Sequence, residues 1–227
     1  VVATPVKDGN YTFAGADGKL VKGVKIAKKS ISGATITLEK DTYTFTGAEI
    51  IPNLTVKDGS YTLEKGVDYT VKVKDNKNVG TATVTITPTN VSDYDTTTTI
   101  TATFKIEAAK AEDVKITLSG NDNKAVASKK ADGTTIANTF DYNKGKQIQP
   151  KVTAVTLNGN DVTEYFDITY PTYGENNTAG TGAGSVTISP KTTTKNFTGT
   201  KTHLFNIKGD ELTGKLKVYY TDKTLVN

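Results

Sequence analysis

The sequence contains no cysteine, no tryptophan and no methionine, and it has a single histidine. Without cysteine the chain cannot form disulfides, thiolate zinc sites or a cysteine nucleophile. A small all-β protein exported from an animal cell would usually carry disulfides. Their absence fits a cytosolic protein or an exported protein of a Gram-positive bacterium.

Arginine is absent as well, so lysine supplies all 28 basic residues of a chain with a net charge of +4. Arginine forks onto phosphates and guanine edges, whereas lysine acts only as a point charge. Because the lysines are scattered, we expect no nucleic-acid partner. We expect a solvated basic surface with at most weak attraction to anionic cell-wall polymers or acidic membranes.

Long hydrophobic runs are also missing. No apolar run approaches the roughly 20 residues that a membrane-spanning helix needs, so we expect no transmembrane segment. The opening VVATPVKDG lacks the basic and apolar regions of a signal peptide. We therefore expect a mature or trimmed piece of a longer exported protein.

Threonine, valine, isoleucine, tyrosine and glycine dominate the sequence, a composition typical of strands and turns. In DYTVKVKDNKN, apolar residues at positions 69, 71 and 73 alternate with Lys72 and Lys74. In GTATVTITP, Ala82, Val84 and Ile86 alternate with threonine. Such period-two alternation in short strands predicts an antiparallel β-sandwich, and no segment shows convincing helical periodicity.

The strand pattern occurs twice in the chain. Apolar and turn residues of the first copy recur about a hundred residues later, pairing Tyr43 with Phe140, Phe45 with Tyr142, Gly47 with Gly145, Ile50 with Ile148, Val84 with Val186, Ile86 with Ile188, Phe104 with Phe205 and Ile106 with Ile207. This recurrence predicts two copies of one fold. The second copy contains an insertion, NDNKAVASKKADGTTIANT, which we expect to form a long loop or an extra hairpin.

Two stretches resemble the Ig-like repeats of large Firmicutes surface proteins. They are ISGATITLEKDTYTFTGAEIIPNLTVKDGSYTLEKGVDYTVKVKDNKNVGTATVTI in the first copy and NFTGTKTHLFNI in the second. The resemblance implies an Ig-like fold, and a location outside the cell at its surface or in its wall. It also implies modules that act as spacers, stalks or adhesive units beside other domains.

The predicted fold is all-β, with two tandem Ig-like antiparallel β-sandwich domains and short flanking β segments. Residues 1–28 are an N-terminal β segment or the remnant of a preceding module. The first Ig-like repeat covers 29–108 and the second, with its inserted loop, covers 109–208. Residues 209–227 form a C-terminal strand segment.

No group of residues in the sequence predicts catalysis. His203 has no second histidine or cysteine as a partner for a metal or a proton relay. The segment GTGAG, Gly180 to Gly184, lacks the Lys-Ser/Thr and the helix of a phosphate loop, so we expect a flexible hairpin loop there. We predict no enzyme activity, no catalytic residues, no cofactor and no metal.

Three oxygen-rich segments could be mistaken for calcium loops: DNKN at 75–78, GNDNK at 120–124 and NGND at 158–161. Each lacks the spaced acidic residues and the terminal bidentate glutamate of a dedicated calcium site. We therefore expect these segments to be turns.

Carbohydrate is the ligand class that the sequence best supports. Sugar platforms use exposed aromatics, and Tyr173 lies in a predicted loop near Asn176 and Asn177. Tyr219 and Tyr220 are adjacent in a predicted strand, so one of the two should face outward. These five residues are the candidate carbohydrate contacts.

The favoured function is structural: a non-catalytic spacer of an exported Gram-positive surface protein, as part of a stalk, a surface layer (S-layer) or a fibre. Its partners would be neighbouring modules or further copies of itself. Two alternatives remain open, a carbohydrate or cell-wall binding module with a polysaccharide partner, and a host-receptor adhesin domain.

Overall fold

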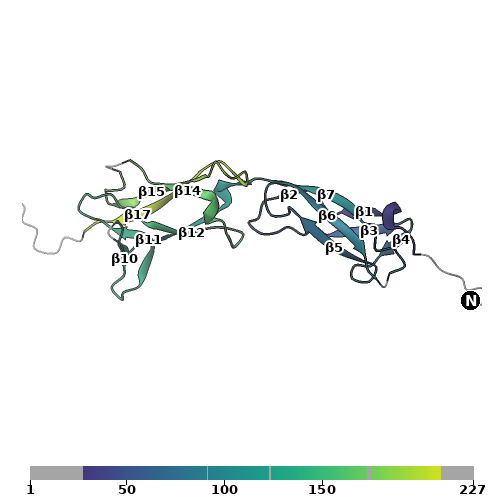
Figure 1. Ribbon diagram of the computed structural model, residues 1–227. Helices are drawn as coiled ribbons and strands as arrows, with labels where there is room; N and C mark the ends of the chain where they lie inside the picture. Colours follow the sequence, from purple (N-terminus) through teal and green to yellow (C-terminus); the bar gives the residue numbers. More distant parts are fainter. Residues whose placement is uncertain (1–27, 91, 123, 173–174, 211–227) are drawn as a thin grey trace, which may run out of the picture. The chain divides into compact units, whose positions relative to one another are not determined.

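The computed structural model describes residues 28–90, 92–122, 124–172 and 175–210 (Figure 1). This part of the chain is all-β, which confirms the predicted class. Its helical content is three single 3-10 turns, η1 (Ile31–Gly33), η2 (Ala111–Asp113) and η3 (Thr163–Tyr165). None of these turns is long or apolar enough to cross a membrane.

The described residues up to Glu107 form two sheets. The first has three strands in the order β1 (Thr35–Leu38), β3 (Leu54–Asp58) and β4 (Tyr61–Leu63). The second has four strands in the order β2 (Thr42–Thr44), β7 (Ile100–Glu107), β6 (Gly80–Pro88) and β5 (Tyr69–Lys74).

The described residues from Ala109 to Asp210 form the other three sheets. One has the order β13 (Asn160–Asp161), β12 (Lys151–Leu157) and β9 (Lys115–Ser119). Another has the order β10 (Ala127–Lys129), β11 (Thr135–Asp141), β17 (Lys201–Lys208), β15 (Gly180–Pro190) and β14 (Phe166–Thr169). The last pairs β16 (Phe197–Thr198) with β8 (Ala109–Lys110).

The strand order of the earlier sheets recurs in the later ones. With β10 set aside, β9, β12 and β13 take the places of β1, β3 and β4, while β11, β17, β15 and β14 take those of β2, β7, β6 and β5. The registers agree too, because Tyr43 lies opposite Ile106 and Phe140 lies opposite Ile207. These are the residue pairs that the sequence comparison equates.

The prediction of wholly antiparallel sheets is wrong for three strand pairs. Strands β2 and β7, β11 and β17, and β8 and β16 run parallel. Residue alternation reports which face of a strand is buried, but it carries no information about the direction of the neighbouring strand. The alternation of apolar and polar residues therefore could not show that these strand pairs are parallel.

The insertion in the second copy forms a hairpin. Strand β10 pairs antiparallel with β11, with Ala127 opposite Phe140 and Lys129 opposite Thr135. The buried hydroxyl of Ser128 donates a hydrogen bond of 2.6 Å to the Asp141 carboxylate. Of the two alternatives, an extra hairpin is therefore what the insertion forms, and it adds an edge strand to the sheet.

The prediction of a flexible hairpin loop at GTGAG is wrong. Residues Gly180 to Gly184 belong to strand β15, where the register with β17 shifts between Gly180 and Gly184. The Asn206 side chain accepts a hydrogen bond of 2.8 Å from the backbone N–H of Gly182 inside this bulge. Gly182 accommodates the bulge, and Gly184 accommodates the close approach of the Phe205 ring. Because glycine is also frequent in loops, the sequence alone does not reveal this role.

The chain divides into two compact units. Among the described residues, the first unit contains 28–37, 54–72 and 84–102. The second contains 38–53, 73–83 and 103–210. Strands β1, β5, β6 and β7 contribute residues to both.

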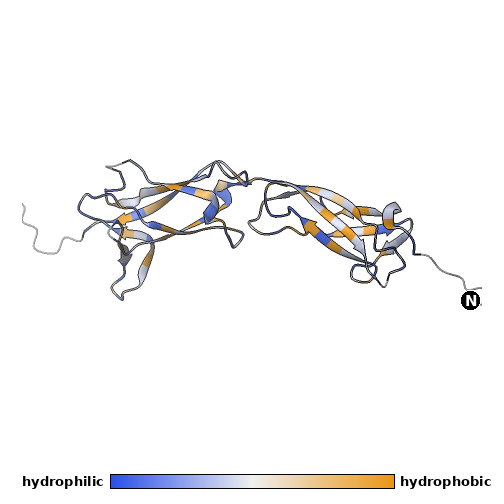
Figure 2. Cartoon of the chain, viewed as in Figure 1, coloured by the Kyte–Doolittle hydropathy of each residue, from blue (hydrophilic) through white to orange (hydrophobic). Residues whose placement is uncertain are grey.

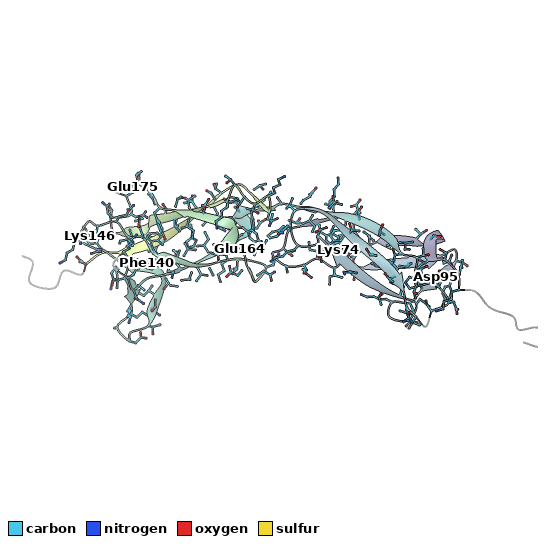
Figure 3. All side chains as sticks on the ribbon, in the orientation of Figure 1. Lys74, Asp95, Phe140, Lys146, Glu164 and Glu175 are labelled. Atoms are coloured by element: carbon cyan, nitrogen blue, oxygen red, sulfur yellow. The ribbon has the colours of Figure 1, made fainter. Side chains whose placement is uncertain are left out.

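The cores follow the predicted alternation, which Figure 2 shows as apolar and polar bands along the strands. In β6, the side chains of Ala82, Val84 and Ile86 are fully buried, as predicted. In the second unit, Phe140 (labelled in Figure 3) meets Phe205 edge-on, with ring centres 5.4 Å apart. The other core residues around this pair are Ala125, Ala127, Ile148 and Ile207.

Candidate functional site

Four aromatic rings form a cluster in the second unit, made of Phe45, Tyr165, Phe166 and Phe197. The ring centre of Phe45 lies 5.2 Å from that of Phe197 and 5.5 Å from that of Tyr165, both edge-on. Phe166 is closest to Phe197, with ring centres 4.5 Å apart. Edge-to-face contacts of this kind add to the stabilisation gained by burying the rings. We call these residues the aromatic cluster.

Polar side chains connect the segments that supply the aromatic cluster. Asn196, which precedes Phe197, accepts a hydrogen bond of 2.9 Å from the backbone N–H of Val79 and donates one of 2.9 Å to the side-chain oxygen of Asn78. Asn160 donates a hydrogen bond of 3.0 Å to the carbonyl oxygen of Thr46. The N–H of Val79 and the carbonyl oxygen of Thr46 therefore have hydrogen-bond partners within the protein.

Gly47 lies in a tight space beside the aromatic cluster. Its φ is +84°, and a Cβ atom at this position would lie 2.9 Å from Cγ1 of Val162 and 3.0 Å from Cβ of Asn160. Both the backbone conformation and the close approach therefore favour glycine. Sequence comparison equates Gly47 with Gly145, but it gives no sign of this contact.

Two polar hollows adjoin the loop at Asn78 and Val79. The larger has a volume of about 450 Å³ and is lined by Asn78, Val79, Glu164, Tyr165 and 193–196. The other, of about 390 Å³, is lined by Glu49 and 75–81. Burial raises the pKa of the Tyr165 phenol, which the charge of Lys77 partly opposes. A phenol ring beside amide and carboxylate groups has the chemistry of a sugar contact.

Of the predicted carbohydrate contacts, Asn176 is 5% exposed. Its side-chain oxygen accepts a hydrogen bond from the N–H of Ser185, and its nitrogen donates to the carbonyl oxygens of Ser185 and Ile148. Asn177 is half-buried and accepts a hydrogen bond from the Thr178 hydroxyl. The polar atoms of the Asn176 side chain thus bond to backbone groups of the second unit.

The tyrosines of the same prediction lie outside the described residues. These are Tyr173, Tyr219 and Tyr220. A carbohydrate contact through them stays a prediction. Tyr165 was missed from the sequence because it lies directly before β14 and the contact with Phe45 joins residues far apart in the chain.

His203 lies in β17 and its Nε2 is 3.0 Å from the side-chain oxygen of Asn138. Burial lowers the His203 pKa, and the charge of Lys201 lowers it further. Asn138 also donates to the carbonyl oxygen of Leu204, so it connects β11 to β17 at two neighbouring residues. The contacts of His203 are therefore those of a strand-bridging residue.

Two of the three oxygen-rich segments, at 120–124 and 158–161, make turn contacts. Asp122 accepts hydrogen bonds from the N–H groups of Lys124 and Ala125. Asn158 and Gly159, with φ of 50° and 85°, form the two-residue connection between β12 and β13. Within the described ranges, no group of three or more acidic or histidine side chains could hold a metal ion.

Comparison of the chain with protein-family models, with curated proteins and with solved structures finds no match. The resemblance to Firmicutes Ig-like repeats therefore rests on the sequence pattern alone.

Proposed function

We propose that this chain is a non-catalytic structural module of an exported Gram-positive surface protein, as part of a stalk, surface layer or fibre. Its two repeats, 29–108 and 109–208, would be tandem Ig-like sandwiches. The observation that carries the proposal is the recurrence of one strand order, with the same parallel pairing of Tyr43 with Ile106 and of Phe140 with Ile207. Successive copies of one fold are how arrayed spacer proteins are built.

The exposed side chains of the strands support the same proposal. In β5, an edge strand, Lys72 and Lys74 are exposed, and lysine on an edge strand opposes unwanted pairing with other chains. In β7, the exposed positions carry Thr101, Thr103 and Lys105. A polar outer face keeps such a module soluble outside the cell.

A second candidate function is binding of a carbohydrate or cell-wall polymer. The observation that favours it is the hollow lined by Tyr165, Asn78 and Glu164. Tyr173, Tyr219 and Tyr220 are further contacts under this alternative. Binding would then supplement the spacer role of the repeats.

Retention of the purified chain on insoluble polysaccharides and Gram-positive cell walls, at low and high salt, tests the two functions against each other. The structural proposal predicts no retention that survives high salt, and no change on replacing Tyr173 or Tyr219 with alanine. Retention on one polymer at high salt, lost on these replacements, would establish the binding function instead. Retention that salt abolishes would reflect lysine charge.

A further inference from the structure

The Asn196 side chain is paired on both of its polar atoms and is almost completely buried. Its oxygen accepts from the N–H of Val79 and its nitrogen donates to the side chain of Asn78, each over 2.9 Å. Only 4% of the residue is exposed. A buried amide in this state is costly to disrupt, because each group left without a partner has already lost its water.

The corresponding position of the first copy shows that local strand geometry does not require this amide. The carbonyl oxygen of Asp93 accepts a hydrogen bond from the N–H of Lys29, as that of Asn196 does from the N–H of Ala109. A buried aromatic follows in each case, Tyr94 or Phe197. Asp93, however, is exposed. The asparagine at 196 is therefore explained by the loop that it contacts.

Two further contacts hold a second segment in the same way. The Asn160 side chain donates to the carbonyl oxygen of Thr46 over 3.0 Å. The next residue, Gly47, approaches Val162 so closely that a Cβ atom would lie 2.9 Å from its Cγ1. Directly before these two contacts in the chain, Phe45 is 1% exposed within the aromatic cluster.

We infer that Asn196 is a positioning residue that clamps the loop at Asn78 and Val79 onto the later strands of the same unit, with Asn160 doing the same for the turn at Thr46. When this part of the protein unfolds locally, the loop at Asn78 and Val79 and the turn at Thr46 should detach in the same event as η3 and β16. This inference deepens the proposed structural function and rests on it, because clamped loops limit local opening in a spacer. It needs no ligand.

Hydrogen exchange of single amides in the full chain, followed by NMR, tests the clamp. Replacing Asn196 with alanine should speed exchange of the Val79 amide about tenfold or more, the change that loss of one well-formed hydrogen bond allows. The Ile50 amide, which donates to the carbonyl oxygen of Asn76, should keep its rate. Asn53→Ala is the matched control. The Asn53 side chain is exposed, and among the described residues it donates a hydrogen bond only to Glu39.

Asn196→Asp is the second variant, and it keeps an acceptor for the Val79 amide while losing the donor to Asn78. We expect the Val79 amide to exchange more slowly in this variant than in Asn196→Ala. Unchanged Val79 exchange in Asn196→Ala, or an equal increase in Asn53→Ala, would overturn the inference. These measurements contain no polysaccharide, so failure of the clamp and failure of the proposed function are distinguished.

Discussion

Gly184 lies against the ring of Phe205, and a Cβ atom at position 184 would come within 2.1 Å of the ring's Cε2. Both residues are buried. Gly184→Ala should therefore lower the free energy of unfolding by about 1–3 kcal/mol, the usual cost of overpacking a core. Urea denaturation followed by circular dichroism measures this difference.

The control for Gly184 is Gly33→Ala, because a Cβ atom at position 33 meets nothing within 4 Å. We expect Gly33→Ala to change the free energy of unfolding by less than about 0.5 kcal/mol. Equal effects of the two variants would contradict the ring contact.

Gly47 and Gly66 form a second matched pair. Their φ angles are +84° and +87°, but only at Gly47 does a Cβ atom meet neighbours, Val162 and Asn160. Alanine at either position should cost about 1 kcal/mol for its left-handed backbone. Gly47→Ala should cost a further 1–3 kcal/mol or so in the free energy of unfolding, because the neighbours must move. Thermal denaturation of the two variants gives the difference, and similar melting temperatures would refute it.

The hydroxyl of Tyr43 is buried and has no hydrogen-bond partner. Burial and then the charge of Glu39 raise the pKa of this phenol, and the backbone of Lys40 lowers it in part. The corresponding residue of the second copy is Phe140. Tyr43→Phe should therefore raise the free energy of unfolding, by up to about 1 kcal/mol, since it removes an unsatisfied polar group. A loss of stability in urea denaturation would show that the hydroxyl has a partner.

Asn176 should be far more sensitive to substitution than Asn158. Both have a left-handed backbone, with φ of 55° and 50°, which glycine tolerates. Asn176→Gly removes three hydrogen bonds to Ser185 and Ile148, and should cost about 2–4 kcal/mol in the free energy of unfolding. Asn158 is exposed, so Asn158→Gly should stay within about 0.5 kcal/mol of the original chain. Chemical denaturation of the two variants side by side checks the prediction.

Tyr94 gives the stability a dependence on alkaline pH. Burial, and then the hydrogen bond of 2.7 Å that its hydroxyl donates to Asp58, raise the Tyr94 pKa from 10.0 to about 12. Between these two values the unfolded chain releases the phenol proton while the folded chain keeps it. The contribution of Tyr94 is therefore complete below pH 10 and is lost as the pH rises toward 12.

Tyr94→Phe isolates this contribution from the titration of the lysines. The difference in unfolding free energy between the original chain and the variant should shrink as the pH rises from 9 to about 12. A difference that is constant over this range would mean that the phenol titrates equally in the folded and unfolded states.

Much of the strand arrangement was predictable from alternation. The buried faces of β6 and β7 follow the sequence pattern, because each strand has one face toward a core. Strand direction was not predictable, since the pairing of β2 with β7 depends on residues distant in the sequence. The bulge at Gly182 escaped prediction for a related reason: it depends on the Asn206 side chain of another strand.

The candidate site was less predictable than the fold. The amide of Asn176 suggested a ligand contact, but its partners are backbone groups supplied by the fold itself. Conversely, Tyr165 lies in no motif, and the motif NFTGTKTHLFNI that begins at Asn196 gives no sign of its partner, because the contacts of these two residues with Phe45 and Val79 join residues far apart in the chain. Contacts of this kind arise only once the backbone is in place.

The parallel pairing of β2 with β7 and of β11 with β17 also constrains how the chain is made. Thr42 acquires its partner only when Lys105 is present, and Thr139 only when Asn206 is present. An early strand of each copy must therefore wait for that copy's last strand before its sheet can close. During synthesis, each copy would emerge almost entirely before it could fold, and the unpaired early strands would be its most vulnerable part.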